Sequence, residues 1–105
     1  MALPQLTPEQ RAEALAKAAA ARRERAAVKN RLKNAQGSLK EVVDEGKRHD
    51  VIGKMKVSAL LESMPSIGRV RARQIMEEIG ISESRRVRGL GTNQIAALLE
   101  RFGEH

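Results

Sequence analysis

The first half of the chain shows an almost continuous pattern of helix-forming residues. Thr7–Gln10 (TPEQ) places a capping hydroxyl before a proline at the first helical position, and its glutamine is placed to close a capping box. Alanine, arginine, lysine, glutamate and leucine follow as far as Glu45, where Gly46 is a natural stop. The pattern predicts one helix over residues 8–45, with Gly37-Ser38 as the point where it would kink or break. Unbroken, this helix would be about 57 Å long, so part of it should protrude from so small a domain.

The hydrophobic pattern divides this helix into two halves. Residues 12–27 contain nine alanines, and Leu15 is their only large apolar residue. Apolar residues then recur at helical spacing and form one face: Val28, Leu32, Ala35, Leu39, Val42 and Val43. We therefore expect the second half to dock on a hydrophobic core while the first half extends into solvent.

The second half of the chain predicts shorter helices. They cover residues 57–64, ended by Pro65, residues 69–79, capped by Gly80, and a last segment capped by Thr92, in which Ile95, Leu98, Leu99 and Phe102 recur at helical spacing before Gly103. Residues 46–56, punctuated by Gly46 and Gly53, look like a connector, and residues 82–87 form at most a short helical turn. No segment alternates as a half-buried strand would. The prediction is an all-α fold, with a long N-terminal helix within residues 1–46 packed on a small helical domain of residues 47–105.

Charge and composition narrow the classes of partner. The 105 residues include 20 Lys and Arg against 13 Asp and Glu, a net charge of +7, which favours a polyanion such as DNA, RNA or an anionic membrane. Aromatic residues make up only 1%, so base stacking on single strands is disfavoured. No segment approaches the ~18 apolar residues of a membrane span, and the first 30 residues lack an export signal, so we expect a cytoplasmic protein without a membrane partner.

Catalytic and metal chemistry find little support. The chain has no cysteine and two histidines, which removes thiol nucleophiles and cysteine-based metal sites. Glu77-Glu78 and Asp44-Glu45 are adjacent in sequence, so on helices they point in different directions. Gly89-Leu90-Gly91 lacks the third glycine and the preceding strand of a dinucleotide loop. We expect no enzyme activity, no metal, no cofactor and no small-molecule substrate.

The first candidate site is the turn between the two middle helices, here called the hairpin. It comprises Met64, Pro65, Ser66, Ile67, Gly68, Arg69, Val70 and Arg71. Gly68 would permit a tight, closely approachable turn, and the helix after it presents free N–H groups and its positive dipole end. Arg69, Arg71 and Arg73 crowd that first turn, where the dipole disfavours cations, which points to a partner anion. The alternative is a plain helix–helix turn with solvated arginines.

A second candidate follows, here called the arginine loop. It comprises Ser82, Arg85, Arg86, Val87, Arg88, Gly89, Leu90, Gly91, Thr92, Asn93 and Gln94. If the two helix starts lie on one face, they would grip the phosphate rows on either side of a groove. The basic and polar groups stand at helix starts and not in the middle of a recognition helix, which favours backbone and minor-groove contacts with little sequence discrimination.

These residues carry a resemblance. Pro65-Ser66-Ile67-Gly68, Ala72, Ile75 and Gly80-Ile81, followed by Gln94-Ile95, resemble the helix-two-turns-helix module of a small-subunit ribosomal protein and of some DNA-repair glycosylases. Over its whole length, including the N-terminal helix rich in alanine and arginine, the chain resembles the actinobacterial integration host factor family.

The resemblance implies a cytoplasmic, nucleoid-associated protein that binds duplex DNA with little sequence preference, bends and compacts it, and supports phage-type site-specific integration. It implies DNA contacts from Met64 to Arg71 and lid-like contacts from Ser82 to Gln94, and we expect a monomer. Many such modules have glycine where this chain has Ser66, whose Cβ limits backbone freedom and whose hydroxyl could donate to a phosphate. The chain begins Met1-Ala2-Leu3 and offers neither the N-terminal catalytic residue nor the zinc ribbon of the repair enzymes.

The long helix carries a further basic stripe, formed by Arg22, Arg25, Lys29 and Lys33. It lies about 100° around the helix axis from the apolar face, so it should stay exposed when that face docks. We expect a second DNA surface, separate from the hairpin and the arginine loop, which would hold another duplex or bend one sharply. The alternative is a solvated flank that serves only solubility.

Two other functions compete with duplex binding. A ribosome-binding or structured-RNA-binding protein would share the module, and A-form RNA, with its wide, shallow minor groove, would then compete with DNA. A helical adaptor would hold a protein partner through an apolar groove, and its binding would survive high salt.

Overall fold

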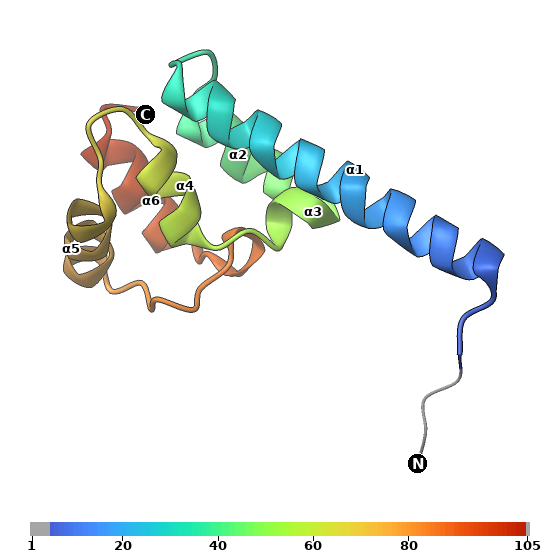
Figure 1. The fold of residues 1–105 in the computed structure, drawn as a ribbon. Coiled ribbons are helices and arrows are strands. Elements are labelled where there is room, and N and C mark those ends of the chain that lie inside the picture. The colour runs from blue at the N-terminus through green and yellow to red at the C-terminus, as the bar shows by residue number, and fades with distance from the viewer. Residues whose placement is uncertain (1–4, 105) are drawn as a thin grey trace.

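The computed structural model describes residues 5–104, and Met1-Ala2-Leu3 lies outside them. The described residues form six α-helices and one 3₁₀ helix, η1, with only an isolated β-bridge and no strand. The elements are α1 (Pro8–Lys33), α2 (Leu39–Gly46), α3 (Asp50–Gly53), α4 (Val57–Ser63), α5 (Arg69–Ile79), η1 (Val87–Gly89) and α6 (Thr92–Arg101). The expected all-α fold is confirmed. Figure 1 shows α1 as a rod whose first half extends beyond the other helices.

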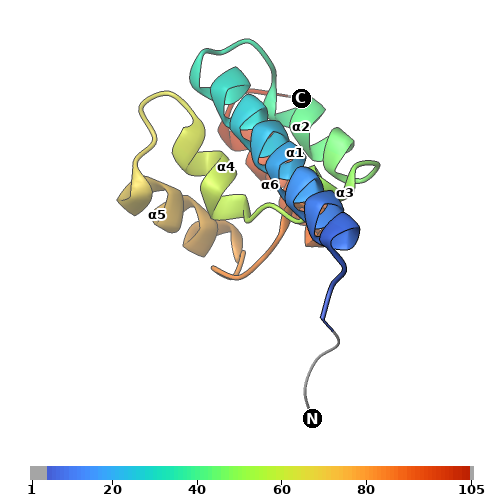
Figure 2. The same cartoon turned by 45° about the vertical axis from the view of Figure 1, so that its right-hand side comes forward.

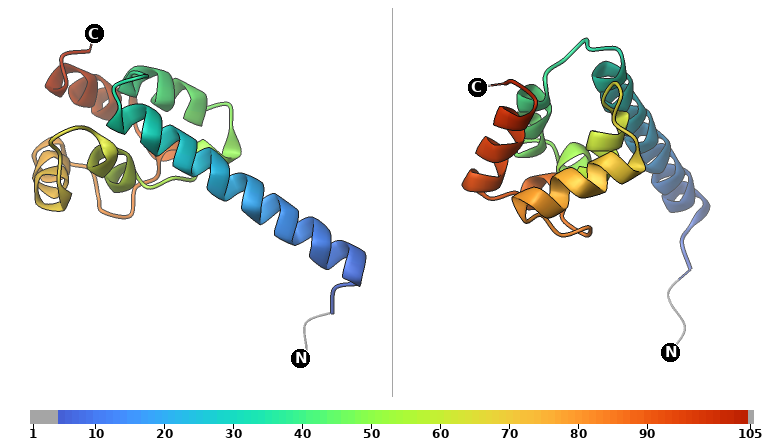
Figure 3. Two further views of the ribbon diagram at one scale, coloured as in Figure 1. Left: turned by 45° about the horizontal axis from the view of Figure 1, so that its top comes forward. Right: turned by 90° about the vertical axis from the view of Figure 1, so that its left-hand side faces the viewer.

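The start of α1 has the predicted cap. The Thr7 hydroxyl accepts from the Gln10 amide at 3.1 Å, and the Thr7 amide donates to the Gln10 side chain at 3.0 Å. No side chain from Glu9 to Ala27 is buried, and Val28 is the first residue of α1 in the core. The first half of the helix therefore projects into solvent, as the left view of Figure 3 shows.

The helix predicted over residues 8–45 is not continuous: α1 ends at Lys33, and Ser38, part of the predicted weak point Gly37-Ser38, is the N-cap of α2. Ala35 adopts a left-handed backbone with φ 54°. The Ala35 amide donates to the Leu32 carbonyl at 3.3 Å, and the Gln36 amide donates to the Arg31 carbonyl at 2.8 Å. These two bonds form a Schellman motif, which closes a helix and turns the chain away from its axis. Ala35 is exposed and does not belong to the apolar face.

Two side chains accept hydrogen bonds from the backbone amides at the start of α2. The Ser38 hydroxyl accepts from the Glu41 amide at 3.1 Å. The Glu104 carboxylate accepts from the Leu39 amide at 2.9 Å and from the Lys40 amide at 3.0 Å. Three of the four orphan donors of a helix start thus have partners, and a negative charge stands at the positive end of the dipole. The C-terminal segment is thereby tied to α2.

Two buried clusters form the core, and Met64 packs against both. The first joins α2, α4, α5 and α6: Leu39, Val43, Val57, Leu61, Ala72, Ile75, Met76, Ile81, Leu90, Leu98 and Leu99. The second attaches α1 and η1: Val28, Leu32, Val42, Ile52, Met55, Leu60 and Val87. Each fully buried Leu contributes roughly 1.5–3 kcal/mol, so Leu32 with its neighbours holds α1 across the domain. In Figure 2, α1 lies between α4 on one side and α2 and α3 on the other.

Two glycines set the spacing of α2, α3 and η1. A Cβ on Gly46 would stand 2.6 Å from Val87 Cγ1, and a Cβ on Gly53 would stand 2.4 Å from the Gly46 carbonyl oxygen. The sequence suggested a helix stop and a connector here. Instead Gly46 is the buried last residue of α2, and the connector contains a short helix, α3, that ends at Gly53.

The remaining helices follow the predictions closely. The helix predicted over residues 69–79 is α5, and Gly80 caps it in the left-handed region with φ 87°. Residues 82–86 are not helical, since η1 begins only at Val87. Thr92 is the first residue of α6 and not its cap, which is Gly91. No helix within residues 5–104 has the length and apolar character needed to cross a membrane.

Replacing Ala35 by glycine should stabilise the protein. Glycine adopts a positive φ without the steric cost that alanine bears, so the free energy of unfolding should rise by about 1 kcal/mol. For a domain of this size, that corresponds to an increase in Tm of roughly 4–8 °C in a thermal melt followed by circular dichroism. Ala96→Gly, the same change at an exposed position inside α6, should lower Tm. A fall in Tm for Ala35→Gly would contradict the proposed end of α1.

Candidate nucleic-acid interface

The hairpin turn lies at Pro65-Ser66. The Ile67 amide donates to the Met64 carbonyl at 3.1 Å, and Ser66 has φ 66°. Proline at the second position and a positive φ at the third match a type II turn, where glycine is usual at the third. Ser66 therefore adopts a backbone conformation that favours glycine, and the residue is exposed.

The backbone conformation of Gly68 differs from the tight turn expected there. Its φ of −92° and ψ of −178° are extended, so the backbone there does not require glycine. It is the N-cap of α5 and offers no side-chain cap, and a Cβ at this position would meet nothing within 4 Å. No side chain at Gly68 therefore covers the open backbone amides in the first turn of α5. Val70, in the same turn, is 71% exposed.

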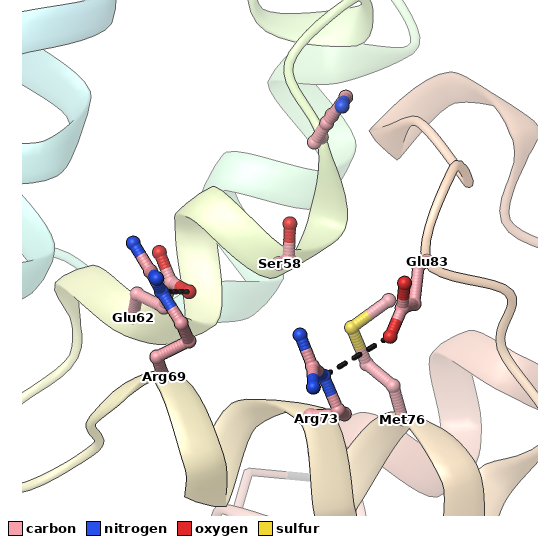
Figure 4. A pocket seen from close by; sticks show the side chains of 7 residues that line it. Ser58, Glu62, Arg69, Arg73, Met76 and Glu83 are labelled. Carbon is pink, nitrogen blue, oxygen red and sulfur yellow. Dashed lines mark ion pairs between the residues drawn. The ribbon is translucent and has the colours of Figure 1, made fainter.

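Two of the three arginines at the start of α5 have partners inside the fold. Arg73 Nε lies 3.0 Å from a Glu83 carboxylate oxygen, and Arg69 Nε lies 3.9 Å from Glu62 Oε1 (Figure 4). Arg71 forms no ion pair within residues 5–104. The argument for a partner anion at this helix start therefore depends on Arg71 and the open backbone amides.

The arginine loop is fastened to the segment before α4. The Val57 amide donates to the Arg85 carbonyl at 3.0 Å, and the Val87 amide donates to the Met55 carbonyl at 2.9 Å, on either side of the Lys56–Arg86 bridge. Val87 is 2% exposed and Leu90 is 9% exposed. These two side chains were expected among the contact residues, but they are buried and hold the loop in place.

Three arginines and two hydroxyls gather on the outer side of this loop. One concavity there, here called the loop concavity, is lined by Ser82, Ser84, Arg85, Arg86, Arg88 and Gly89. No carboxylate is among these lining residues in the described chain. Such a set of charge-assisted donors suits an oxyanion such as phosphate.

Each of these arginines also has a structural contact. Arg85 donates to the Gly89 carbonyl at 3.1 Å, while its buried Nε has no partner within the described residues. Arg86 donates to the Lys54 carbonyl. Arg88 lies 3.9 Å from Asp50 Oδ1. The guanidinium groups are thus positioned by the fold over one concavity.

The half-buried Gln94 side chain forms two hydrogen bonds within the fold. Its side-chain oxygen accepts from the Gly91 amide at 3.0 Å, and its side-chain nitrogen donates to the Gly80 carbonyl at 3.1 Å. The start of α6 is thereby held beside the end of α5, leaving Thr92 and Asn93 exposed at the first turn.

Two residues of the basic stripe of α1 lie close to the arginine loop. Arg25 and Lys29 line a second concavity, here called the α1 concavity, together with Arg86 of the loop. Its other lining residues are Val51, Lys54, Met55, Lys56 and Ala59. Arg86 lines both concavities, so this part of the stripe adjoins the loop. Arg22 and Lys33 are exposed on the same helix.

Sequence reasoning did not assign a site to Lys54 and Lys56. The signal that could have identified them is the excess of basic residues within 46–56, a segment whose glycines indicate only a connector. No group of three or more potential metal ligands occurs within residues 5–104.

Comparison with known proteins agrees with this architecture. Residues 32–102 match the family model of the S13-like H2TH domain. A protein named integration host factor from Streptomyces coelicolor is 74% identical over 103 residues, which cover 98% of this chain and 96% of the relative. The integration host factor of Mycobacterium tuberculosis is 58% identical over 103 residues, or 98% of each chain.

A solved structure has nearly the same fold. The structure of sIHF bound to an 8-bp palindromic DNA has a TM-score of 0.82 and 72% sequence identity, covering 83% of this chain and 98% of the other. The likeness extends over both the long helix and the helical domain, at an identity far above that of chance resemblance. The chain therefore belongs to the integration host factor family and carries an S13-like H2TH domain.

Proposed function

We propose that this chain is a cytoplasmic, nucleoid-associated protein that binds duplex DNA with little sequence preference. Binding bends and compacts the duplex and supports site-specific phage integration. The observation that carries the proposal is the set of outward arginines and hydroxyls in the loop concavity, on a chain 72% identical to a protein solved with DNA.

The geometry favours contacts with the DNA backbone. The hairpin immediately precedes α5, and the arginine loop follows that 11-residue helix in the chain. Two basic segments that are separated in this way can each contact a different row of phosphates. The hairpin offers open backbone amides and the loop offers guanidinium groups, and both kinds of donor suit phosphate oxygens.

The charge of the α1 stripe supports bending. Arg25 and Lys29 stand beside Arg86, so a duplex seated on the arginine loop would meet further cations where α1 leaves the domain. Closing around these cations neutralises phosphates on one side of the duplex, which favours bending toward the protein. The relatives named integration host factor and the DNA-bound neighbour favour this function over binding of structured RNA.

Affinity for random-sequence duplex should fall steeply with salt. If five or six cations meet phosphates, log K plotted against log salt should have a slope of roughly −5. Fluorescence anisotropy across a series of salt concentrations measures this slope. A slope near −1, or a preferred site that wins by more than a thousandfold, would contradict non-specific backbone binding. Competition with duplex RNA of the same sequence is the control, and preference for the RNA would favour the ribosomal alternative.

Gly68→Val should weaken DNA binding without unfolding the protein. The new side chain would enter open space and not the core, so stability should drop by less than about 1 kcal/mol through the poorer N-cap. Its branched Cβ would stand between a phosphate and the first amides of α5, and we expect an affinity loss of at least tenfold in the same anisotropy assay. Normal binding by a folded Gly68→Val protein would show that the hairpin amides do not contact DNA.

Replacing Arg85, Arg86 and Arg88 together by glutamine should flatten the salt dependence. Glutamine keeps side-chain donors near the Gly89 and Lys54 carbonyls but removes three charges. Because each lost phosphate contact lowers the slope by about 0.9, the value should change from roughly −5 to about −2. Circular dichroism should remain that of the parent protein. An unchanged slope in a folded triple variant would move the main contact away from this loop.

A further inference from the structure

The α1 concavity collects positive charge from three separate parts of the chain. Arg25 and Lys29 come from α1, Lys54 and Lys56 from the segment between α3 and α4, and Arg86 from the arginine loop. Within residues 5–104 none of these five cations forms an ion pair with a carboxylate. The residues that line the concavity in the described chain include no acid. Five like charges around one hollow repel one another unless an anion neutralises them.

The opposite flank of α1 is built differently. There Arg31 lies 3.0 Å from a Glu45 carboxylate oxygen and 3.6 Å from Glu41. Glu24 and Glu45 also line the hollow on that side. The same helix therefore has one flank whose cation is balanced by acids and one flank whose cations are unbalanced. Solubility alone would not require this asymmetry.

The floor of the α1 concavity adds a second chemical feature. Val51, Met55 and Ala59 line the concavity together with the cations. Met55 is fixed in the core at 4% exposure, and the Val87 amide donates to its carbonyl at 2.9 Å. A lining that combines apolar and cationic side chains suits a chain of phosphates joined by sugars, because the sugars can pack on apolar surface while the cations bind the phosphates.

We propose that the α1 concavity is a phosphate-binding site that takes consecutive phosphate groups of a nucleotide chain, with Lys54 and Lys56 as its principal ligands alongside Arg25, Lys29 and Arg86. It deepens, and rests on, the proposed binding of duplex DNA. Because Arg86 also lines the loop concavity, the two concavities adjoin, and the phosphate track proposed here extends from the arginine loop to Arg25 and Lys29 of α1. A duplex on this track would contact the α1 concavity in addition to the hairpin and the arginine loop. Free polyphosphates share this chemistry and would compete for the site.

The test compares two pairs of lysines that carry the same charge. Lys54→Gln with Lys56→Gln removes two charges from the concavity, while Lys40→Gln with Lys47→Gln removes two from exposed positions on and just after α2. The Lys54 and Lys56 side chains are exposed, and the Lys54 carbonyl that holds Arg86 belongs to the backbone, so the fold should be kept. We expect the first pair to lower affinity for a 20-bp random duplex about tenfold and to flatten the salt slope by about 2. The second pair should leave the slope unchanged.

A second readout uses the complete parent chain, labelled with ¹⁵N, and amide NMR shifts. Shifts at residues 25–29, 54–56 and 86 on addition of duplex alone would assign the site to DNA phosphates. The same shifts with inorganic tripolyphosphate would add free polyphosphate as a ligand. If neither probe moves these amides and both lysine pairs bind DNA alike, the inference is overturned. A parent protein that does not bind duplex would refute the proposed function, while the tripolyphosphate titration would still test the site by itself.

Discussion

The close contact of Gly46, Gly53 and Val87 sets the geometry on which the rest of the site depends. Neither glycine has room for a Cβ, and Val87 fills the space that a side chain on Gly46 would take. This contact lets η1 approach α2 and α3, and the backbone bonds from Val87 to Met55 and from Val57 to Arg85 then fix the arginine loop. A bulkier residue would displace the loop, and with it both concavities that share Arg86.

The placement of α1 is the second determinant of the interface. Val28 and Leu32 bury one side of the helix in the second cluster, so the two flanks beside them face different neighbours. One flank meets acids from α2, and the other meets the basic segment before α4. Within residues 5–104 the cations on the second flank form no ion pair with a carboxylate, so their charge is available to the phosphate groups proposed as their ligands. An arm that projects from this point extends the charged surface beyond the domain.

Helix ends provide much of the remaining order. Ser38 and Glu104 satisfy the start of α2, and Gln94 links the start of α6 to the end of α5. The start of α5 differs from both, because Gly68 offers no side-chain cap and its surroundings are open. The starts of α3 and α4 also lack a side-chain cap, but α5 is the longest of these three helices, and its open start is consistent with the anion site proposed there.

The sequence by itself determined the helical class, the capping box at Thr7 and the limits of α5, because caps, stops and apolar spacing are local properties of the chain. It also identified the hairpin and the arginine loop as basic segments, because the clustering of arginines is visible in the sequence. It did not determine the end of α1, because the left-handed residue there is Ala35 and not the glycine that usually indicates such a turn. The start of α2 is stabilised by the Glu104 carboxylate, 65 positions away in the chain, which no local pattern indicates. The sequence assigned Val87 and Leu90 to the contact surface, but tertiary packing buries both side chains. Only the tertiary structure brought Lys54 and Lys56 beside Arg25, Lys29 and Arg86, because the packing of α1 against α4 and the loop, and not any local pattern, decides which cations meet.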